Sequence, residues 1–415
     1  MREGSAVLGS GEHTTADRVV YHVDADCFYA ACERLEEPSL EGEPVVVGMG
    51  YDEDDQTGAV ATASYEAREH GVESAQPISR AVERLPPASR VDDDHDGPTA
   101  HYRPVDMEYY EDVAADVKEI LHGVADTVRE VSVDEAYLDV TETVGWDDAE
   151  AVADDLKRGI AERVGVTVSI GVAPTMSAAK IASDHDKPDG LVVVPPGDVR
   201  DFLAPLDVED VHGVGPVTAD ALRDLGIATA GDLAEADPGT LRDRFGERGV
   251  TIRNHARGDD RREVTPREPA KSLLRASAID DPTDAVAALR ERLGGLARAV
   301  AEKARSRGAM YRTIGIVVVT PPFDRNTRER SLSGPVDDPE IVRDVADDLF
   351  EEFYGETVRK LGVRVSNLEY PDHDQAALGS YTDDEDGDGE LEHRGTRTTA
   401  SGGDDGGQAG LDEFG

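Results

Sequence analysis

The sequence lacks several features that would place the protein in a specialised class. It contains only two cysteines, Cys27 and Cys32, which are too few and too close together to form a disulfide framework. No apolar run approaches the roughly 20 residues that span a membrane, and no apolar signal segment opens the chain. We therefore expect a cytoplasmic protein with no membrane partner, in which the two thiols are small buried hydrophobes.

Lysine is also scarce, and acidic residues dominate the charge. The chain has 7 Lys and 36 Arg against 89 Asp and Glu, which gives a formal net charge of −46. So large a charge is typical of proteins adapted to molar salt, where carboxylates keep the surface hydrated. The alternative is an ordinary acidic protein. In either case, net charge bears on solubility and association rather than on the fold.

The acidity is distributed unevenly along the chain. Residues 271–370 hold 16 basic and 17 acidic side chains, and 301–330 within them hold seven basic and three acidic ones. A locally basic stretch in an acidic protein is where a polyanion would bind. The candidate phosphate contacts are Lys303, Arg305, Arg307, Arg312, Arg325, Arg328 and Arg330. For any one of them the alternative is a solvated cation on the surface.

At 415 residues, the chain is long enough for two to four domains and a substantial core. From 19 to 194, apolar runs that resemble strands alternate with segments of helical periodicity, which predicts a mixed sheet covered by helices. Short helices punctuated by Gly and Pro follow over 197–258, and a second α+β unit runs from 273 to 370. The polar, Gly-rich residues 1–17 are expected to form a flexible extension. The Asp/Gly/Thr-rich tail 371–415 is expected to be disordered, because it cannot bury a core.

Two stretches place carboxylates at the ends of apolar strands. In "VYHVDADCFYAACE", Asp24 and Asp26 follow such a run, and in "SVDEAYLD" Asp134 and Glu135 lie between two strand segments. Carboxylates that converge there repel one another unless cations screen them, and oxygen ligands favour Mg²⁺ or Mn²⁺ over zinc. Two such ions can clamp the attacking and leaving oxygens of a phosphoryl displacement. The alternative is an acidic turn that serves solubility.

Groups suited to phosphate lie nearby in the sequence. "ATASYEAREHG" spaces Thr62, Tyr65 and Arg68 three residues apart, which predicts that they share one face of a short helix. "ASDHDKPDG" adds Lys187 just before a proline that ends a helix. An Arg fork and a Lys ammonium are common phosphate ligands. The alternative for each is again a solvated surface side chain.

Five motifs, in this order, resemble those of the Y-family translesion DNA polymerases of the DNA polymerase IV type. They are VDADCFYAACE, ATASYEAREHG, SVDEAYLD, SIGVAPTMSAAKIASDHDKPDG and VHGVGPVTADAL. The resemblance implies an α+β multidomain right-hand polymerase with a mixed-sheet palm, small fingers, a helical thumb and an α+β little finger. The implied parts are an extension (1–17), palm (18–27 and 96–190), fingers (28–95), thumb (191–260), linker (261–272), little finger (273–370) and acidic tail (371–415).

The resemblance also implies the reaction. The chain would be a template-directed, low-fidelity DNA polymerase that performs translesion synthesis, using two Mg²⁺ ions, or Mn²⁺, to transfer nucleotides from dNTPs to a primer 3′-hydroxyl. By resemblance, Asp24 and Asp134 bridge the two ions, Glu135 completes the catalytic site, and the backbone carbonyl of Ala25 serves the nucleotide-bound ion. Tyr65, Arg68 and Lys187 match the family's triphosphate contacts. Thr62 is expected to assist them in binding the triphosphate.

The first motif carries three further expectations. Tyr29 matches the family's steric gate, a ring that lies under the sugar where a 2′-hydroxyl would project. Phe28 is expected in the core, and Asp26 is expected to cap the helix that begins after it. One departure from the family is Gln76 in "SAQPIS", where relatives often have Met or Ile, so the finger surface that faces the template base is undetermined.

Two segments predict contacts with larger partners. In "VHGVGPVTADALRDLG", Gly213 and Gly215 form the turn of a helix–hairpin–helix, which directs backbone N–H groups at DNA phosphates; a turn used only for packing is the alternative. The terminal "QAGLDEFG" places Gln408, Leu411 and Phe414 at the 1, 4 and 7 positions of a sliding-clamp-binding motif. The expected partners are primer–template DNA, dNTPs and the clamp, and the protein is expected to be a monomer.

The sequence disfavours two rival functions. A nucleotide cyclase also carries two metals on a palm-like sheet, but the thumb motif and the basic last unit disfavour it. A DNA-binding scaffold with a vestigial palm is disfavoured by the presence of all the catalytic and triphosphate residues, which are Asp24, Asp134, Glu135, Arg68 and Lys187.

Overall fold

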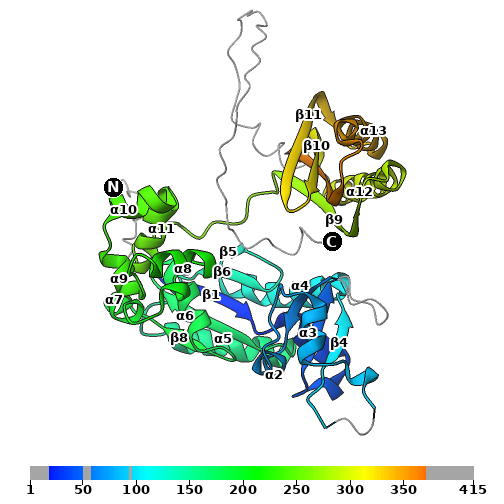
Figure 1. Cartoon of the computed structure of the whole chain (residues 1–415). Coiled ribbons are helices and arrows are strands. Elements are labelled where there is room, and N and C mark those ends of the chain that lie inside the picture. Colours follow the sequence, from blue (N-terminus) through cyan, green and yellow to red (C-terminus); the bar gives the residue numbers. More distant parts are fainter. Residues whose placement is uncertain (1–17, 50–57, 93–95, 371–415) are drawn as a thin grey trace, which may run out of the picture. The chain divides into compact units, whose positions relative to one another are not determined.

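The computed structural model describes residues 18–49, 58–92 and 96–370 (Figure 1). The chain divides into two compact units, Met1–Arg267 and Glu268–Gly415. None of the helices in the described part of the chain combines the length and the apolar character that a membrane span requires.

The first unit is built on a five-stranded sheet of order β5-β6-β1-β7-β8. The central strand β1 (Val20–Ala25) pairs antiparallel with both β6 (Glu135–Asp139) and β7 (Val168–Ala173). The outer strands are β5 (Thr127–Glu130) and β8 (Leu191–Val193). All six residues of β7 are buried, as expected for an apolar strand covered on both faces of the sheet.

Helices cover the two faces of this sheet (Figure 1). They are α4 (Met107–Val124), α5 (Ala149–Arg163) and α6 (Met176–His185). On one face, the Tyr21 hydroxyl donates a hydrogen bond to the carbonyl oxygen of Ala149, at the start of α5. On the other face, Val20 packs with the apolar residues of α6. Because successive residues of β1 point to opposite faces, His22 and Asp24 lie on the α6 face with Val20.

A smaller three-stranded sheet of order β3-β2-β4 belongs to the same unit. Its strands are β2 (Val45–Met49), β3 (Ala59–Ala63) and β4 (His101–Pro104), and its neighbouring helices are α1 (Phe28–Glu36), α2 (Tyr65–Glu69), α3 (Ile78–Arg84) and two 3₁₀ turns, Pro38–Leu40 and Ala88–Arg90. β4 was not anticipated from the sequence. It pairs in parallel with β2, although its residues fall in the range expected for the palm. β8 likewise joins the large sheet from within the range expected for the thumb.

Short helices form the rest of the first unit, as predicted. They are α7 (Val199–Leu203), α8 (Pro216–Arg223), α9 (Ala230–Glu235), α10 (Pro238–Phe245), α11 (Glu247–Ala256) and a 3₁₀ turn, Val208–Asp210. Local sequence signals start two of them. Thr229 and Asp232 form a capping box at α9, and Asp237 caps α10 with Pro238 in the first turn.

Asp260 connects the chain after α11 to the start of α6. Its buried carboxylate accepts a hydrogen bond from the N–H of Ser177 at 3.0 Å and two from the Arg262 guanidinium at 2.9 and 2.8 Å. Burial alone would raise the pKa of Asp260, but the hydrogen bonds from Arg262 outweigh it and hold the pKa at about 2. The ionised carboxylate thus fixes α6, the helix that carries much of the site described below.

The second unit is a four-stranded antiparallel sheet of order β11-β10-β12-β9 with two helices. The strands are β9 (Ser272–Thr283), β10 (Met310–Thr320), β11 (Asp324–Val336) and β12 (Val358–Glu369), and the helices are α12 (Val286–Ser306), α13 (Pro339–Phe350) and the 3₁₀ turn Glu351–Phe353. Alternate residues of β10, Ile314, Ile316 and Val318, form a core with both helices. The helices therefore cover one face of the sheet, and the intervening residues form the opposite face.

Candidate active site

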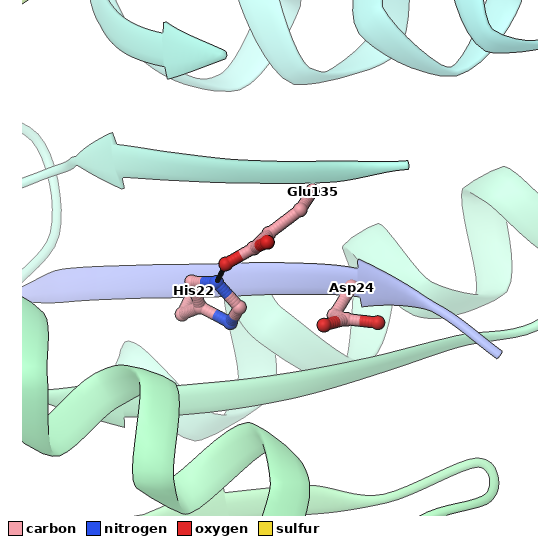
Figure 2. A group of neighbouring side chains, drawn as sticks. All are labelled: His22, Asp24 and Glu135. Atoms are coloured by element: carbon pink, nitrogen blue, oxygen red, sulfur yellow. Dashed lines mark hydrogen bonds and ion pairs between the residues drawn. The ribbon is translucent and has the colours of Figure 1, made fainter. Parts of the chain in front are cut away.

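The candidate active site lies at the end of β1, where two carboxylates face each other across neighbouring strands. Asp24 stands opposite Glu135 of β6 in the antiparallel register, so the two side chains project from the same face. His22 precedes Asp24 by two positions and lies on that face as well (Figure 2). One nitrogen or oxygen atom from each of these residues lies within 4.8 Å of the others. Strand pairing thus gathers two carboxylates and one imidazole at a single point.

His22 holds Glu135 in position. The imidazole is fully buried, with Nε2 2.6 Å from Oε1 of Glu135 and Nδ1 2.7 Å from Oγ of Ser183. The Ser183 hydroxyl also lies 2.7 Å from the carbonyl oxygen of Lys180. Because burial favours the neutral imidazole, we assign its one proton to Nε2, which donates it to the Glu135 carboxylate, and Nδ1 accepts the Ser183 proton. Burial lowers the pKa of His22, and it would raise that of Glu135, but the hydrogen bond from His22 keeps the Glu135 pKa low.

Two lysines neutralise Asp24. Lys180 Nζ lies 2.7 Å from one carboxylate oxygen of Asp24, and Lys187 Nζ lies 2.5 Å from the other. Lys180 is also 3.7 Å from Glu135, and both lysines reach Asp184, at 3.2 and 3.1 Å. Burial would raise the pKa of Asp24, but the two ammonium groups outweigh it and hold the pKa at about 2. Asp24 therefore stays ionised.

Asp134 stands apart from this group. It precedes β6, and its carboxylate accepts a hydrogen bond from the Ser132 hydroxyl at 2.7 Å. Its carbonyl oxygen accepts the N–H of Ala25, the buried last residue of β1, at 3.0 Å. Burial raises the pKa of Asp134, and the nearby negative charge of Asp24 adds to the effect. The structure thus brings Asp24 and Glu135 together and leaves the Asp134 carboxylate within electrostatic reach of them.

Asp26 does not cap a helix, so that prediction was wrong. The residue before α1 is Cys27, whose φ of 41° turns the chain and which makes no side-chain cap. The buried Asp26 carboxylate instead accepts hydrogen bonds from the Ser169 hydroxyl at 3.0 Å, the Asp189 N–H at 2.8 Å and the Tyr65 hydroxyl at 3.1 Å. Asp26 therefore ties the end of β1 to α2 and to the loop after α6.

The residues predicted to bind phosphate divide between a strand and a helix. Tyr65 and Arg68 lie on α2, which Ser64 caps, but Thr62 lies on β3, so the three do not share one helical face. The Arg68 guanidinium lies 4.8 Å from the centre of the Tyr65 ring, and its Nε donates to the carbonyl oxygen of Ala63 at 2.9 Å. Tyr65 and Arg68 therefore form one ordered pair, fixed to Asp26 through the Tyr65 hydroxyl.

Both aromatic residues of the first motif are buried. Phe28 lies in the core, as predicted. The Tyr29 ring, 1% exposed, stacks on Tyr110 of α4 with 4.6 Å between ring centres and 15° between planes. The Tyr110 hydroxyl in turn donates a short hydrogen bond to Glu33, whose carboxylate is 3.7 Å from Arg103. The orientation of the Tyr29 ring is thus set by α4.

The two cysteines behave as expected from their spacing. Both are free thiols; Cys32 is buried and Cys27 is partly buried. Burial raises the pKa of Cys27 to about 11 and that of Cys32 to about 12. Both side chains are therefore protonated, unreactive packing residues at neutral pH.

The glycine-rich turn has the geometry of a helix–hairpin–helix. Gly213 has a φ of 91°, which suits glycine, and Gly215 immediately precedes α8, whose first residue is Pro216. Arg248 of α11 donates a hydrogen bond to the carbonyl oxygen of Gly213 at 3.1 Å. The turn is thereby held in place while the first N–H groups of α8 point away from the helix body.

The seven cations expected on the second unit do not share one face. Arg328 stands opposite Ile316 and Arg330 opposite Ile314, so both lie on the face that the helices cover. Arg328 forms an ion pair with Glu352 at 2.7 Å, and Arg330 forms one with Asp348 at 2.9 Å. Arg305 donates to the carbonyl oxygen of Asp337, and Arg312 pairs with Glu369. Lys303 and Arg307 lie at the end of α12.

The face away from the helices carries a different set of cations. Arg325 and Lys360 both stand opposite Val319 in the register, and Arg364 stands opposite Gly315, on the same side. Lys360 and Arg364 were missed in the sequence. The alternation of Leu361, Val363 and Val365, all buried, could have revealed them, because the residues between must face the other way.

Family profiles match three separate parts of the chain. The profile described as impB/mucB/samB family covers residues 23–184, the IMS family HHH motif covers 196–227, and the impB/mucB/samB family C-terminal domain covers 270–378. A curated "DNA polymerase IV" from Halobacterium salinarum is 56% identical over 404 residues, which are 97% of this chain and 98% of that protein. The chain belongs to the Y-family of DNA polymerases. Another relative of that name, from Methanoculleus marisnigri, is 40% identical over 89% of this chain and 99% of its own length.

Solved structures agree with this assignment. The "Y-family DNA polymerase chimera Dbh-Dpo4(243-245)-Dbh" matches with a TM-score of 0.73 at 28% identity, over 84% of this chain and 99% of that chain. The "Insertion ternary complex of Dbh DNA polymerase" matches over the same shares with a TM-score of 0.61 and 28% identity. The predicted family, right-hand fold and enzyme class are therefore confirmed: the chain is a low-fidelity, DNA-directed DNA polymerase of the translesion class.

His22 and Lys180 were not predicted from the sequence. The role of His22 in holding Glu135 can be tested by substitution. His22→Leu removes the group that holds Glu135, so we expect nucleotide incorporation at saturating DNA and dNTP to fall by about ten- to a hundredfold. The affinity for primer–template DNA should not change. The matched control is His255→Leu, because His255 is also buried but donates its hydrogen bond to the carbonyl oxygen of His212, away from the carboxylates. Full incorporation by a folded His22→Leu protein would show that Glu135 needs no such support.

Proposed function

We propose that Asp24, Asp134 and Glu135 hold the two divalent ions of nucleotidyl transfer, with the carbonyl of Ala25 as a further ligand, and that the ions are Mg²⁺. The observation that carries the proposal is the register of β1 and β6, which sets Asp24 against Glu135. The donors fit a hard cation, since carboxylate and carbonyl oxygens are the ligands Mg²⁺ prefers, and both nitrogens of His22 are already engaged by Ser183 and Glu135. When bound, the ions activate the 3′-hydroxyl and neutralise charge on the phosphates.

The protein's own groups would position the nucleotide. Tyr65, Arg68 and Lys187 are the proposed triphosphate contacts, with Thr62 beside them on β3. Their convergence is supported by Asp26, which binds both the Tyr65 hydroxyl and the N–H of Asp189, two residues beyond Lys187. Lys187 now contacts Asp24, and a triphosphate would offer its ammonium group a more highly charged partner.

We also propose the assignment of parts. The large sheet with α4–α6 is the palm and includes β8; the small sheet with α1–α3 is the fingers and extends to Pro104 through β4. The thumb follows, and the second unit is the little finger. Gly213 and Gly215 would contact DNA phosphates. The sheet face that carries Arg325, Lys360 and Arg364 would contact phosphates as well. Arg328 and Arg330 are instead directed at acids of their own unit by their ion pairs.

Two proposals concern assembly. The protein would act as a monomer, and its C-terminal Gln408, Leu411 and Phe414 would bind a sliding clamp. These three residues lie outside the described residues, so the proposal rests on their spacing and on their place at the end of a polar tail.

Asp134→Ala tests the metal assignment. Loss of a ligand shared by both ions should abolish incorporation and spare DNA binding, since even ~3 kcal/mol of lost transition-state stabilisation slows turnover more than a hundredfold. The control is Asp126→Ala, an exposed acid just before β5. Substantial primer extension by a folded Asp134→Ala protein would refute the two-metal assignment.

Tyr29→Ala tests the steric gate. Removal of the ring should admit ribonucleotides, so the ratio of dNTP to rNTP incorporation efficiency should fall. The neighbouring core substitution Phe28→Ala serves as the control and should leave that ratio near the wild-type value. If only the Phe28→Ala protein changes the ratio, the gate is Phe28.

Deletion of residues 408–415 tests the clamp proposal. Distributive synthesis should be unchanged, and stimulation by the clamp should disappear, because Leu411 and Phe414 supply ~1.5–3 kcal/mol each when buried in a groove. Clamp affinity and clamp-dependent product length are measured for the full chain, the truncated chain and Phe414→Ala. Identical behaviour of all three would leave the tail as a solubilising extension.

A further inference from the structure

One aromatic side chain of the second unit is strongly exposed. Phe323 is 75% exposed in the turn between β10 and β11, after Pro321 and Pro322. A single exposed apolar residue is common and needs no explanation by itself. Phe323, however, is held in a defined arrangement. The Arg359 guanidinium lies 3.9 Å from the centre of its ring and donates a hydrogen bond to the carbonyl oxygen of Pro322 at 2.5 Å.

Two further cations lie at this end of the sheet. Arg325 follows Phe323 by two residues, is exposed, and stands opposite Val319 at the end of the β10–β11 pair. Lys360 stands opposite the same Val319 from the other side, next to Arg359 in the chain. The nearest acids are Asp324 and Glu356 in the sequence and Asp281 of β9, which lies at the same end of the sheet, between Ala278 opposite Lys360 and Thr283 opposite Val358. We refer to Phe323, Arg325, Arg359 and Lys360 as the hairpin tip.

This combination fits one class of ligand. An aromatic ring backed by a guanidinium offers a flat surface on which a nucleobase can stack, and flanking cations attract the phosphates on either side. Bases inside a duplex are covered by their neighbours, so the Phe323 ring can stack on an unpaired base but not on a base inside the duplex. An acidic peptide would use the cations and leave the aromatic surface without a partner.

We propose that the hairpin tip binds unpaired nucleotides of single-stranded template DNA, with one base stacked on Phe323 and the backbone on Arg325 and Lys360. The inference rests on the proposed function of the second unit as a DNA-binding domain. It adds a site for single strands to the sheet face that would contact the duplex. Stacking releases few counterions, so this contact should persist at the high salt that weakens phosphate contacts.

The test uses the full chain and three fluorescent primer–template DNAs. One ends flush, one carries a 5′ template overhang of several nucleotides, and one carries the same overhang with abasic sites in place of bases. Affinities are measured by anisotropy at low and at molar KCl. For the wild type, we expect the overhang with bases to bind more tightly than the flush duplex.

Phe323→Ala should reduce the gain from the overhang by about five- to fiftyfold and leave the flush and abasic DNAs unaffected. Phe323→Trp should keep the gain. The matched control is Tyr354→Ala, since Tyr354 is also an exposed aromatic of this unit, at 42%, but lies after α13. The Phe323→Ala effect should remain at molar KCl, whereas the effect of Arg325→Ala should fade.

Three results would overturn the proposal. They are an unchanged overhang gain in Phe323→Ala, an equal loss on the abasic overhang, and an equal loss on the flush duplex. A Phe323→Ala defect seen only in the presence of a protein partner would overturn it too. Failure of the underlying DNA-binding function has a different signature: the Lys360→Ala/Arg364→Ala double variant would then bind the flush duplex as tightly as the wild type.

Discussion

The structure depends on how the neighbouring carboxylates of Asp24 and Glu135 are stabilised at the end of β1. Asp24 and Glu135 lie side by side and are only 13% and 16% exposed, and two carboxylates at such a distance raise each other's pKa and destabilise the fold unless cations compensate them. Lys180 and Lys187 compensate Asp24, and Glu135 is stabilised by a hydrogen bond from His22 and by Lys180 at 3.7 Å. Asp24 and Glu135 thus stay ionised, as the proposed metal site requires, and neither leaves an uncompensated charge in the fold.

A second layer of buried polar groups keeps these side chains in place. Asp260 fixes the start of α6 through the Ser177 N–H, and α6 supplies Lys180 and Ser183. Asp26 joins β1 to Tyr65 and to the loop that follows Lys187. Asp26 has three hydrogen-bond partners from segments distant in the sequence, and Asp260 has one, Ser177. The site is therefore positioned by the tertiary fold rather than by any one motif.

The sequence predicted the strands that carry the carboxylates, but it did not predict which side chains hold those carboxylates in place. Motif order and strand periodicity were enough to predict Asp24 and Glu135 on neighbouring strands, because each lies in or beside an apolar run. The cap assigned to Asp26 failed because it depended on a backbone turn at Cys27 that propensities do not show. His22 and Lys180 were missed because their partners lie more than a hundred residues away. The arginines of the second unit were grouped by charge alone, whereas strand register decides which face each of them occupies.

The central claim is that Asp24 anchors a two-ion site, and direct counting of bound Mn²⁺ by electron paramagnetic resonance tests it. The sample is the full chain with a dideoxy-terminated primer–template and the next dNTP, in molar KCl to suppress binding to the acidic surface. The account predicts two tightly bound ions in the wild type, loss of both in Asp24→Asn, and retention of both in Asp26→Asn, whose carboxylate is occupied by Ser169 and Asp189. Retention of both ions by Asp24→Asn, with their loss from Asp26→Asn, would contradict it.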